Sequence, residues 1–105
     1  MADQTIPASQ GQHERVTFLN QTVATQGTPE QLATENVWAA WVQLSPSKGN
    51  SGAKAYVCNS AGDATIELPV KIEASEGKHI NLKSLFVDVD TDGDSVSVMY
   101  SATGR

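Results

Sequence analysis

Short runs of alternating apolar and polar residues recur along this chain, with turn sequences between them. The clearest two are residues 84–90 and 95–100, which are joined by Thr91-Asp92-Gly93-Asp94. A period of two is typical of a strand with one buried face, and a Gly-bearing turn between two such runs predicts a β-hairpin. We therefore expect these two runs to pair with each other near the end of the chain.

Further runs of the same kind cover most of the remaining sequence. They lie at residues 15–25, 53–58, 64–68, 70–72 and 79–83, with turn-forming residues between them. Pro69 interrupts two of them, and because proline cannot donate to a strand ladder, it predicts an edge or a bend there. About seven to nine strands spaced about ten residues apart predict an all-β domain, either a β-sandwich or a small barrel.

Residues 29–44 fit two different structures. Thr28-Pro29-Glu30-Gln31 resembles the capping box of a helix, and one helical face would then gather Ala33, Val37, Ala40, Trp41 and Leu44. In the alternative, residues 36–44 form a strand that is buried on both sides, with one face made by Trp38, Ala40, Val42 and Leu44. Asn36 disfavours the middle of a helix, so we favour the strand and keep the helix as the alternative.

The length of 105 residues predicts a single domain. We divide the chain into an extended N-terminal arm at residues 1–14 and a β-sandwich domain at residues 15–105. The arm is polar and contains Pro7, and we take Ile6 as its apolar anchor. Such a segment either frays or lies on a neighbouring subunit.

Charge and cysteine content narrow the classes of partner. The net charge is −5 and the chain has only seven Lys and Arg residues, which are scattered, whereas nucleic-acid binding needs clustered basic side chains. No run approaches the roughly 20 apolar residues that span a bilayer. Cys58 is the single cysteine, and the N-terminus has neither the basic start nor the apolar block of a signal peptide. We expect a protein made in a reducing cytoplasm that contacts neither nucleic acid nor membrane.

The densest group of metal-binding side chains comprises Asp88, Asp90, Asp92 and Asp94. Their spacing, with a glycine in sixth position, matches the beginning of a helix-loop-helix calcium loop. Position twelve is Met99, where that loop requires a bidentate Glu. We therefore expect a turn whose carboxylates point to solvent, with a weak calcium site as the alternative, and we expect no cofactor.

Catalytic patterns are missing from the sequence. His13, His79 and Cys58 lack the spacing of zinc ligands, and no serine lies in a Gly-x-Ser-x-Gly motif. We interpret Cys58 as a buried, inert thiol and His79 as a surface residue, and we expect that the protein is not an enzyme.

Trp38, Trp41 and Tyr56 are a different kind of candidate. Aromatic side chains on strands fill a core or a subunit interface, and they also form platforms for sugar rings. We favour the interface for these three residues and keep the sugar platform as the alternative.

The order of several motifs resembles that of small virion proteins of tailed phages, in particular capsid decoration (cement) proteins. The motifs are Thr22–Leu32 with its Gly-Thr-Pro-Glu turn, Ala55-Tyr56-Val57, the Glu76-Gly77 turn, and residues 85–100. The resemblance covers residues 20–101, which is most of the chain.

This resemblance implies a jelly-roll-like β-sandwich that binds the outer surface of a phage capsid, often as a homotrimer, with the major capsid protein as its partner. The chain would then be a structural virion protein, made in the host cytoplasm, that stabilises the junctions between capsomers. We expect Ile6 and Pro7 to contact the capsid, and Trp38, Trp41 and Tyr56 to lie in interfaces. The alternatives are a carbohydrate-binding or host-adhesion module of a virion, and a head–tail connector or tail component.

Overall fold

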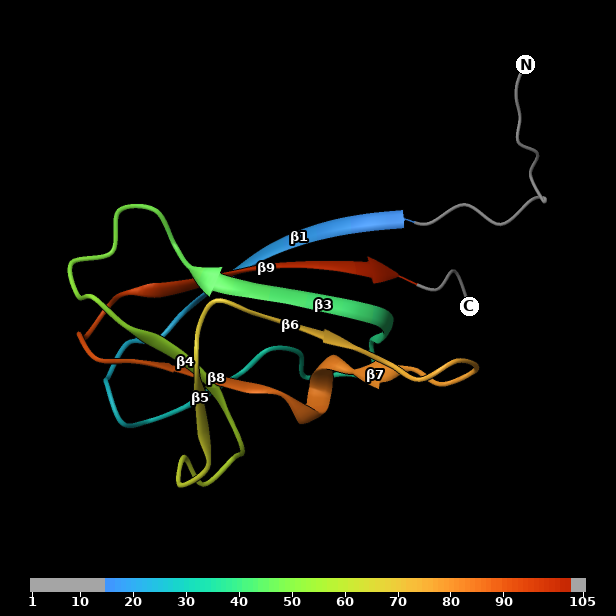
Figure 1. Ribbon diagram of the computed structural model, residues 1–105. Helices are drawn as coiled ribbons and strands as arrows, with labels where there is room; N and C mark the ends of the chain where they lie inside the picture. Colours follow the sequence, from blue (N-terminus) through green and yellow to red (C-terminus); the bar gives the residue numbers. More distant parts are fainter. Residues whose placement is uncertain (1–14, 103–105) are drawn as a thin grey trace, which may run out of the picture.

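The computed structural model describes residues 15–102, which form two antiparallel β-sheets packed face to face (Figure 1). The all-β prediction is therefore confirmed, the two antiparallel sheets are compatible with the predicted β-sandwich, and no α-helix occurs among these residues. The strands are β1 (Arg15–Thr22), β2 (Glu30–Gln31), β3 (Trp38–Pro46), β4 (Ala55–Cys58), β5 (Thr65–Glu67), β6 (Val70–Glu73), β7 (Ile80–Asn81), β8 (Phe86–Val89) and β9 (Ser95–Ala102), and one 3-10 turn, η1 (Leu82–Ser84), precedes β8. The expected arm at residues 1–14, with Ile6 and Pro7, lies outside the described residues.

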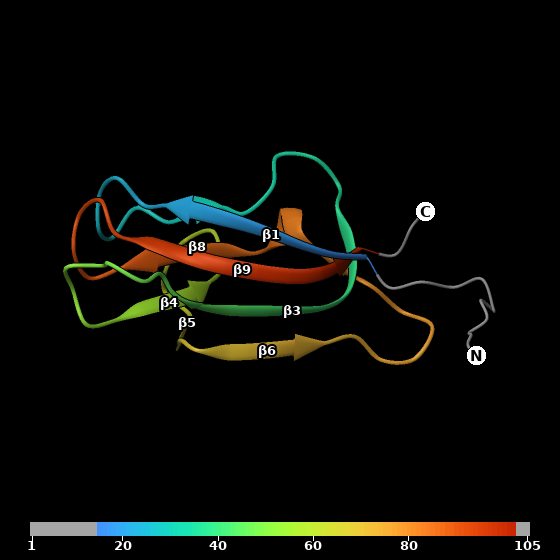
Figure 2. The same ribbon diagram turned by 90° about the horizontal axis from the view of Figure 1, so that it is seen from above.

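The larger sheet has the order β1-β9-β3-β6, and the short β7 pairs with the other half of β3. Figure 2 shows β1, β9, β3 and β6 side by side. The smaller sheet has the order β2-β8-β4-β5. The chain crosses from β5 to β6 at Leu68-Pro69, and both strands are the outermost of their sheets, so the edge expected at Pro69 is confirmed.

The hairpin expected near the end of the chain is wrong. β8 pairs with β2 and β4 in the smaller sheet, whereas β9 pairs with β1 and β3 in the larger one. Residues 90–94 therefore arch from one sheet to the other. Alternation shows that each strand has one buried face, but it does not show which strand is the partner, and here Val87 and Val96 are buried from opposite sides of the core.

Residues 38–46 are a strand, so the strand is confirmed and the helix at residues 29–44 is wrong. The expected burial on both sides is wrong for the single chain, because Trp38 and Gln43 are exposed. The faces of this strand nevertheless differ from the simple alternation that we expected. The register with β9 shifts between Ala39 and Val42, and both of these residues are fully buried. Such a bulge adds one residue to a strand, so Trp38 and Trp41 are both left on the side away from the core.

The core lies between the two sheets and consists mainly of Val, Leu and Ala. Its members are Val23, Leu32, Ala39, Val42, Leu44, Ala55, Val57, Leu68, Leu82, Val87, Val89, Val96 and Val98. Ala55 and Val57 alternate with Tyr56 as the sequence predicts, and they pair with Val89 and Val87 of β8. Burial of such side chains is the main term that holds a sandwich of this size together.

Candidate functional site

The arch at residues 90–94 holds two neighbouring loops with its carboxylates. Asp94 is only 6% exposed, and its Oδ1 and Oδ2 accept hydrogen bonds from the backbone N–H groups of Ser51 (2.9 Å) and Gly52 (2.7 Å). A Cβ on Gly52 would collide with the side chains of Asp90 and Thr91, so this close approach requires glycine. Asp94 thus fixes the loop between β3 and β4.

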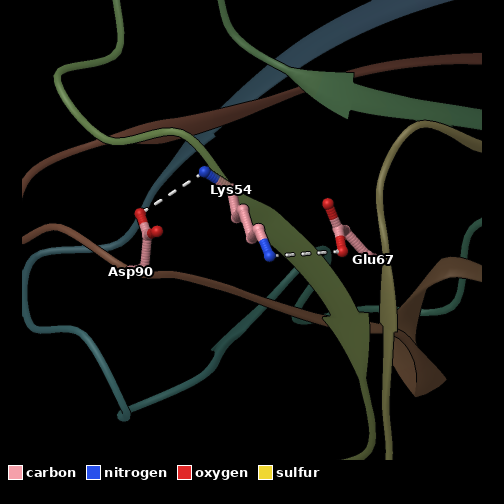
Figure 3. Close-up of polar contacts among 3 residues, drawn as sticks. All are labelled: Lys54, Glu67 and Asp90. Atoms are coloured by element: carbon pink, nitrogen blue, oxygen red, sulfur yellow. Dashed lines mark hydrogen bonds and ion pairs between the residues drawn. The ribbon is translucent and has the colours of Figure 1, made fainter.

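Two other carboxylates hold the loop between β1 and β2. Asp92 Oδ1 accepts from the N–H of Gln26 (2.8 Å), and Asp88 Oδ1 accepts from the N–H of Gly27 (3.0 Å). The fourth, Asp90, contacts the N–H of Lys54 at 3.5 Å, and the ammonium group of Lys54 lies 3.9 Å from Glu67 (Figure 3). Exposed ion pairs of this kind contribute little to stability.

The four aspartates therefore accept hydrogen bonds from two different loops instead of converging on one point. Among residues 15–102, no group of three or more His, Cys, Asp or Glu side chains is arranged to hold a metal ion. The expectation that all four carboxylates point to solvent is wrong for Asp94, which is buried. Its sequence neighbours give no sign of this, because its two donors lie about 40 positions earlier in the chain.

The two tryptophans lie near one end of β3, on the outer face of the larger sheet. Trp38 is 46% exposed. Trp41 is partly buried, and the ammonium group of Lys71 lies 5.0 Å from the centre of its ring. A cation over the ring face is attracted by the ring quadrupole, and it covers that face against a flat ligand. The β-bulge thus brings Trp38 and Trp41 to the same side of the sheet.

Tyr56 lies elsewhere, on the smaller sheet, where it pairs with Asp88 and Glu67. Cys58, which lies two residues after Tyr56 on β4, is buried but does not belong to the core cluster. Burial, and then the nearby Asp88 carboxylate, raises the pKa of the Cys58 thiol above its ordinary value. The thiol is therefore neutral at pH 7 and a poor nucleophile. His79 is exposed, as we expected, and His13 is outside the described residues.

A groove that the sequence does not reveal crosses the outer face of the larger sheet. It has a volume of about 490 Å³, and β1, β3 and β9 line it with Phe18, Leu19, Asn20, Gln43, Ser45, Ser97, Val98 and Met99. Phe18 is 73% exposed, more than any other large apolar side chain of the described residues. The lining residues come from three strands that are far apart in the sequence, so no local motif indicates them.

The comparisons with known proteins add no relative. No protein-family model, no curated protein and no solved structure matches this chain. Within residues 15–102, no helix is long and apolar enough to cross a membrane.

Proposed function

We propose that this chain is a jelly-roll decoration protein of a tailed-phage capsid, and that it binds the outer surface of the head as a homotrimer in contact with the major capsid protein. The strand orders support the jelly roll. If the two-residue β7 is set aside, eight strands remain, and β8 and β9 become the seventh and eighth in chain order. Numbered in this way, the strands pair in the orders 1-8-3-6 and 2-7-4-5, which is the pairing of a double Greek key. Jelly rolls of this kind build viral capsid and lectin domains.

The observation that carries the proposal is an apolar surface at the end of the sheet where the described chain begins. Arg15 and Ala39 are both in register with Ala102 there. Val16, 47% exposed, and Trp38 lie at this same end. We call Val16, Trp38 and Trp41 the terminal patch. Exposed apolar patches on a compact domain mark surfaces that bind other proteins.

The backbone at this end is also available for pairing. β1 pairs with β9 on one side, and no other strand of residues 15–102 pairs with its second side. Between Val16 and Thr22, β1 has no proline and no charged residue, although such residues commonly protect the edges of sheets. An unprotected edge accepts a strand from a neighbouring subunit. Arg15, which follows residue 14 in the chain, lies at this same end of the sheet.

In this role the protein acts mechanically. A rigid two-sheet body that contacts two capsomers adds buried area at their junction, and about 1,600 Å² is enough for a specific interface. The net charge of −5 keeps the free subunits soluble before they assemble on the head.

We expect that Trp38→Ala lowers the occupancy of the chain on phage heads by about tenfold or more, because aromatic anchors dominate binding energy at protein interfaces. Heads that lack the chain are incubated with purified protein, and the bound fraction is measured after sedimentation. Ile66→Ala is the matched control, since Ile66 is 60% exposed but lies on β5 of the smaller sheet. If neither the parent chain nor the control binds heads, the proposed function is wrong. If Trp38→Ala binds as well as the parent, the terminal patch is not the contact.

A further inference from the structure

Two residues that line the outer groove, Asn20 and Ser97, form a hydrogen-bonding network with Ser47. The Ser47 hydroxyl donates to Asn20 Oδ1 at 2.6 Å. The Ser97 hydroxyl lies 2.7 Å from the Ser47 hydroxyl and 3.2 Å from the same Oδ1, and it donates its single proton to one of these two oxygens. We call these three residues the Ser-Asn network. Because Oδ1 of Asn20 accepts from Ser47, its amide group is oriented, and Nδ2 donates to no other described residue. The network therefore presents two oriented N–H donors on an exposed surface.

The loop beside the network is fixed as well. Asn50 makes two hydrogen bonds to the backbone of Ser95, one through Nδ2 (2.8 Å) and one through Oδ1 (2.9 Å). Asp94 holds the next two residues of this loop, as described above. Figure 1 shows the loop rising beyond the end of β3. Ser47 therefore stands at the start of a loop that hydrogen bonds hold in place, and groups that are ordered before a ligand arrives bind it at a lower entropic cost.

The other half of the groove is apolar. Phe18 and Met99 are in register on neighbouring strands, and Gln43 of β3 is in register with Met99. They form a row across three strands, with two apolar side chains next to an exposed amide. The groove thus joins a flat apolar ledge to a row of hydrogen-bonding groups.

None of the eight lining residues carries a charge, although the chain as a whole has a net charge of −5. Phosphate groups and sialic or uronic acids would find no cation in the groove, and the overall charge would repel them. A neutral ligand with one apolar face and several hydroxyl groups fits the lining. Its volume lies within the range of about 300–1,000 Å³ that is usual for small-molecule sites.

We propose that the outer groove binds a neutral saccharide. The apolar C–H face of a sugar ring lies on Phe18, and the ring hydroxyls accept from Asn20 and exchange hydrogen bonds with Gln43. This site differs from the sugar platform considered from the sequence, because Trp41 is covered by Lys71 and Tyr56 is on the other sheet. The proposal goes beyond capsid binding and does not depend on it.

The test uses the purified chain and an array of neutral and acidic glycans that includes maltohexaose, cellohexaose and N-acetylglucosamine tetramers. Titration of the best neutral glycan, followed by amide chemical shifts, locates the contact. We expect shifts at Asn20, Gln43 and Ser97, and we expect Phe18→Ala to weaken binding about tenfold. Gln43→Ala is the second variant, and because both side chains are exposed, both variants should fold. Ile66→Ala, the matched control, should bind as the parent does.

Each other outcome overturns the proposal. These outcomes are a lack of binding to every neutral glycan at millimolar concentration, a preference for acidic glycans, chemical shifts confined to the surfaces around Trp41 or Tyr56, and equal affinity of Phe18→Ala and the parent. Head binding is a separate readout, so a chain that binds heads but no glycan refutes only the groove, and a chain that binds glycan but no heads refutes only the capsid role.

Discussion

The Asp94→Ala variant is expected to lose about 2–3 kcal/mol of unfolding free energy, because it removes two charge-assisted hydrogen bonds from a buried position. The N–H groups of Ser51 and Gly52 lose their acceptor, and the loop between β3 and β4 loses its anchor to the arch. A small domain has a total stability of about 5–15 kcal/mol, so the loss is large. Denaturant unfolding followed by tryptophan fluorescence measures it.

Asp92→Ala is the matched control, because Asp92 lies in the same arch but is exposed and accepts one hydrogen bond, from Gln26. We expect it to cost about 1 kcal/mol or less. Equal losses for the two variants would contradict the role that we assign to Asp94 and would indicate that the arch contributes through its backbone alone.

Leu44→Ala is expected to cost about 3–5 kcal/mol, the range for a leucine that leaves a cavity in a packed core. Leu44 is fully buried on β3, between Val98 of β9 and Val70 of β6. Its truncation removes contacts at the centre of the larger sheet, where the neighbouring strands cannot close the gap without distorting their pairing. The same unfolding experiment measures the loss.

Ile66→Ala removes a side chain of similar size from β5, where it is mostly exposed, and we expect a change within about 0.5 kcal/mol. A small effect of Leu44→Ala, close to that of Ile66→Ala, would show that the two sheets do not pack through Leu44.

Much of the fold can be predicted from the pattern of the sequence. The alternating runs give the all-β class and the approximate positions of β1, β4 and β9, and Pro69 indicates the edge where the chain changes sheets. These features depend on the local preference of each segment, which a period of two expresses directly.

Features that depend on distant contacts could not be predicted in this way. β8 and β9 read as a hairpin, but each of them pairs with strands that are remote in the sequence. The bulge in β3 likewise moves Ala39 into the core in place of Ala40, although the alternation gives no warning of an extra residue.

In the candidate sites, too, the sequence indicates single residues but does not indicate the distant contacts that decide what they do. The four aspartates are conspicuous in the sequence, yet the donors that decide what Asp94 does are at positions 51 and 52. The Ser-Asn network joins residues 20, 47 and 97, and no spacing rule connects them. Trp38 and Trp41 were found from composition, but the bulge that places them on one side was not.

The outer face of the larger sheet thus carries two different surfaces. The terminal patch lies at the end of the sheet where β1 begins, and the outer groove lies toward the loop that Asp94 anchors.

The copy number of the chain in purified virions tests the capsid role most directly, and quantitative mass spectrometry measures it relative to the major capsid protein. We predict a fixed number of copies per virion, of the same order as the number of copies of the major capsid protein, because the proposed binding site repeats over the whole head. Absence from the virion, or only the few copies of a single connector or tail ring, would contradict the proposed function.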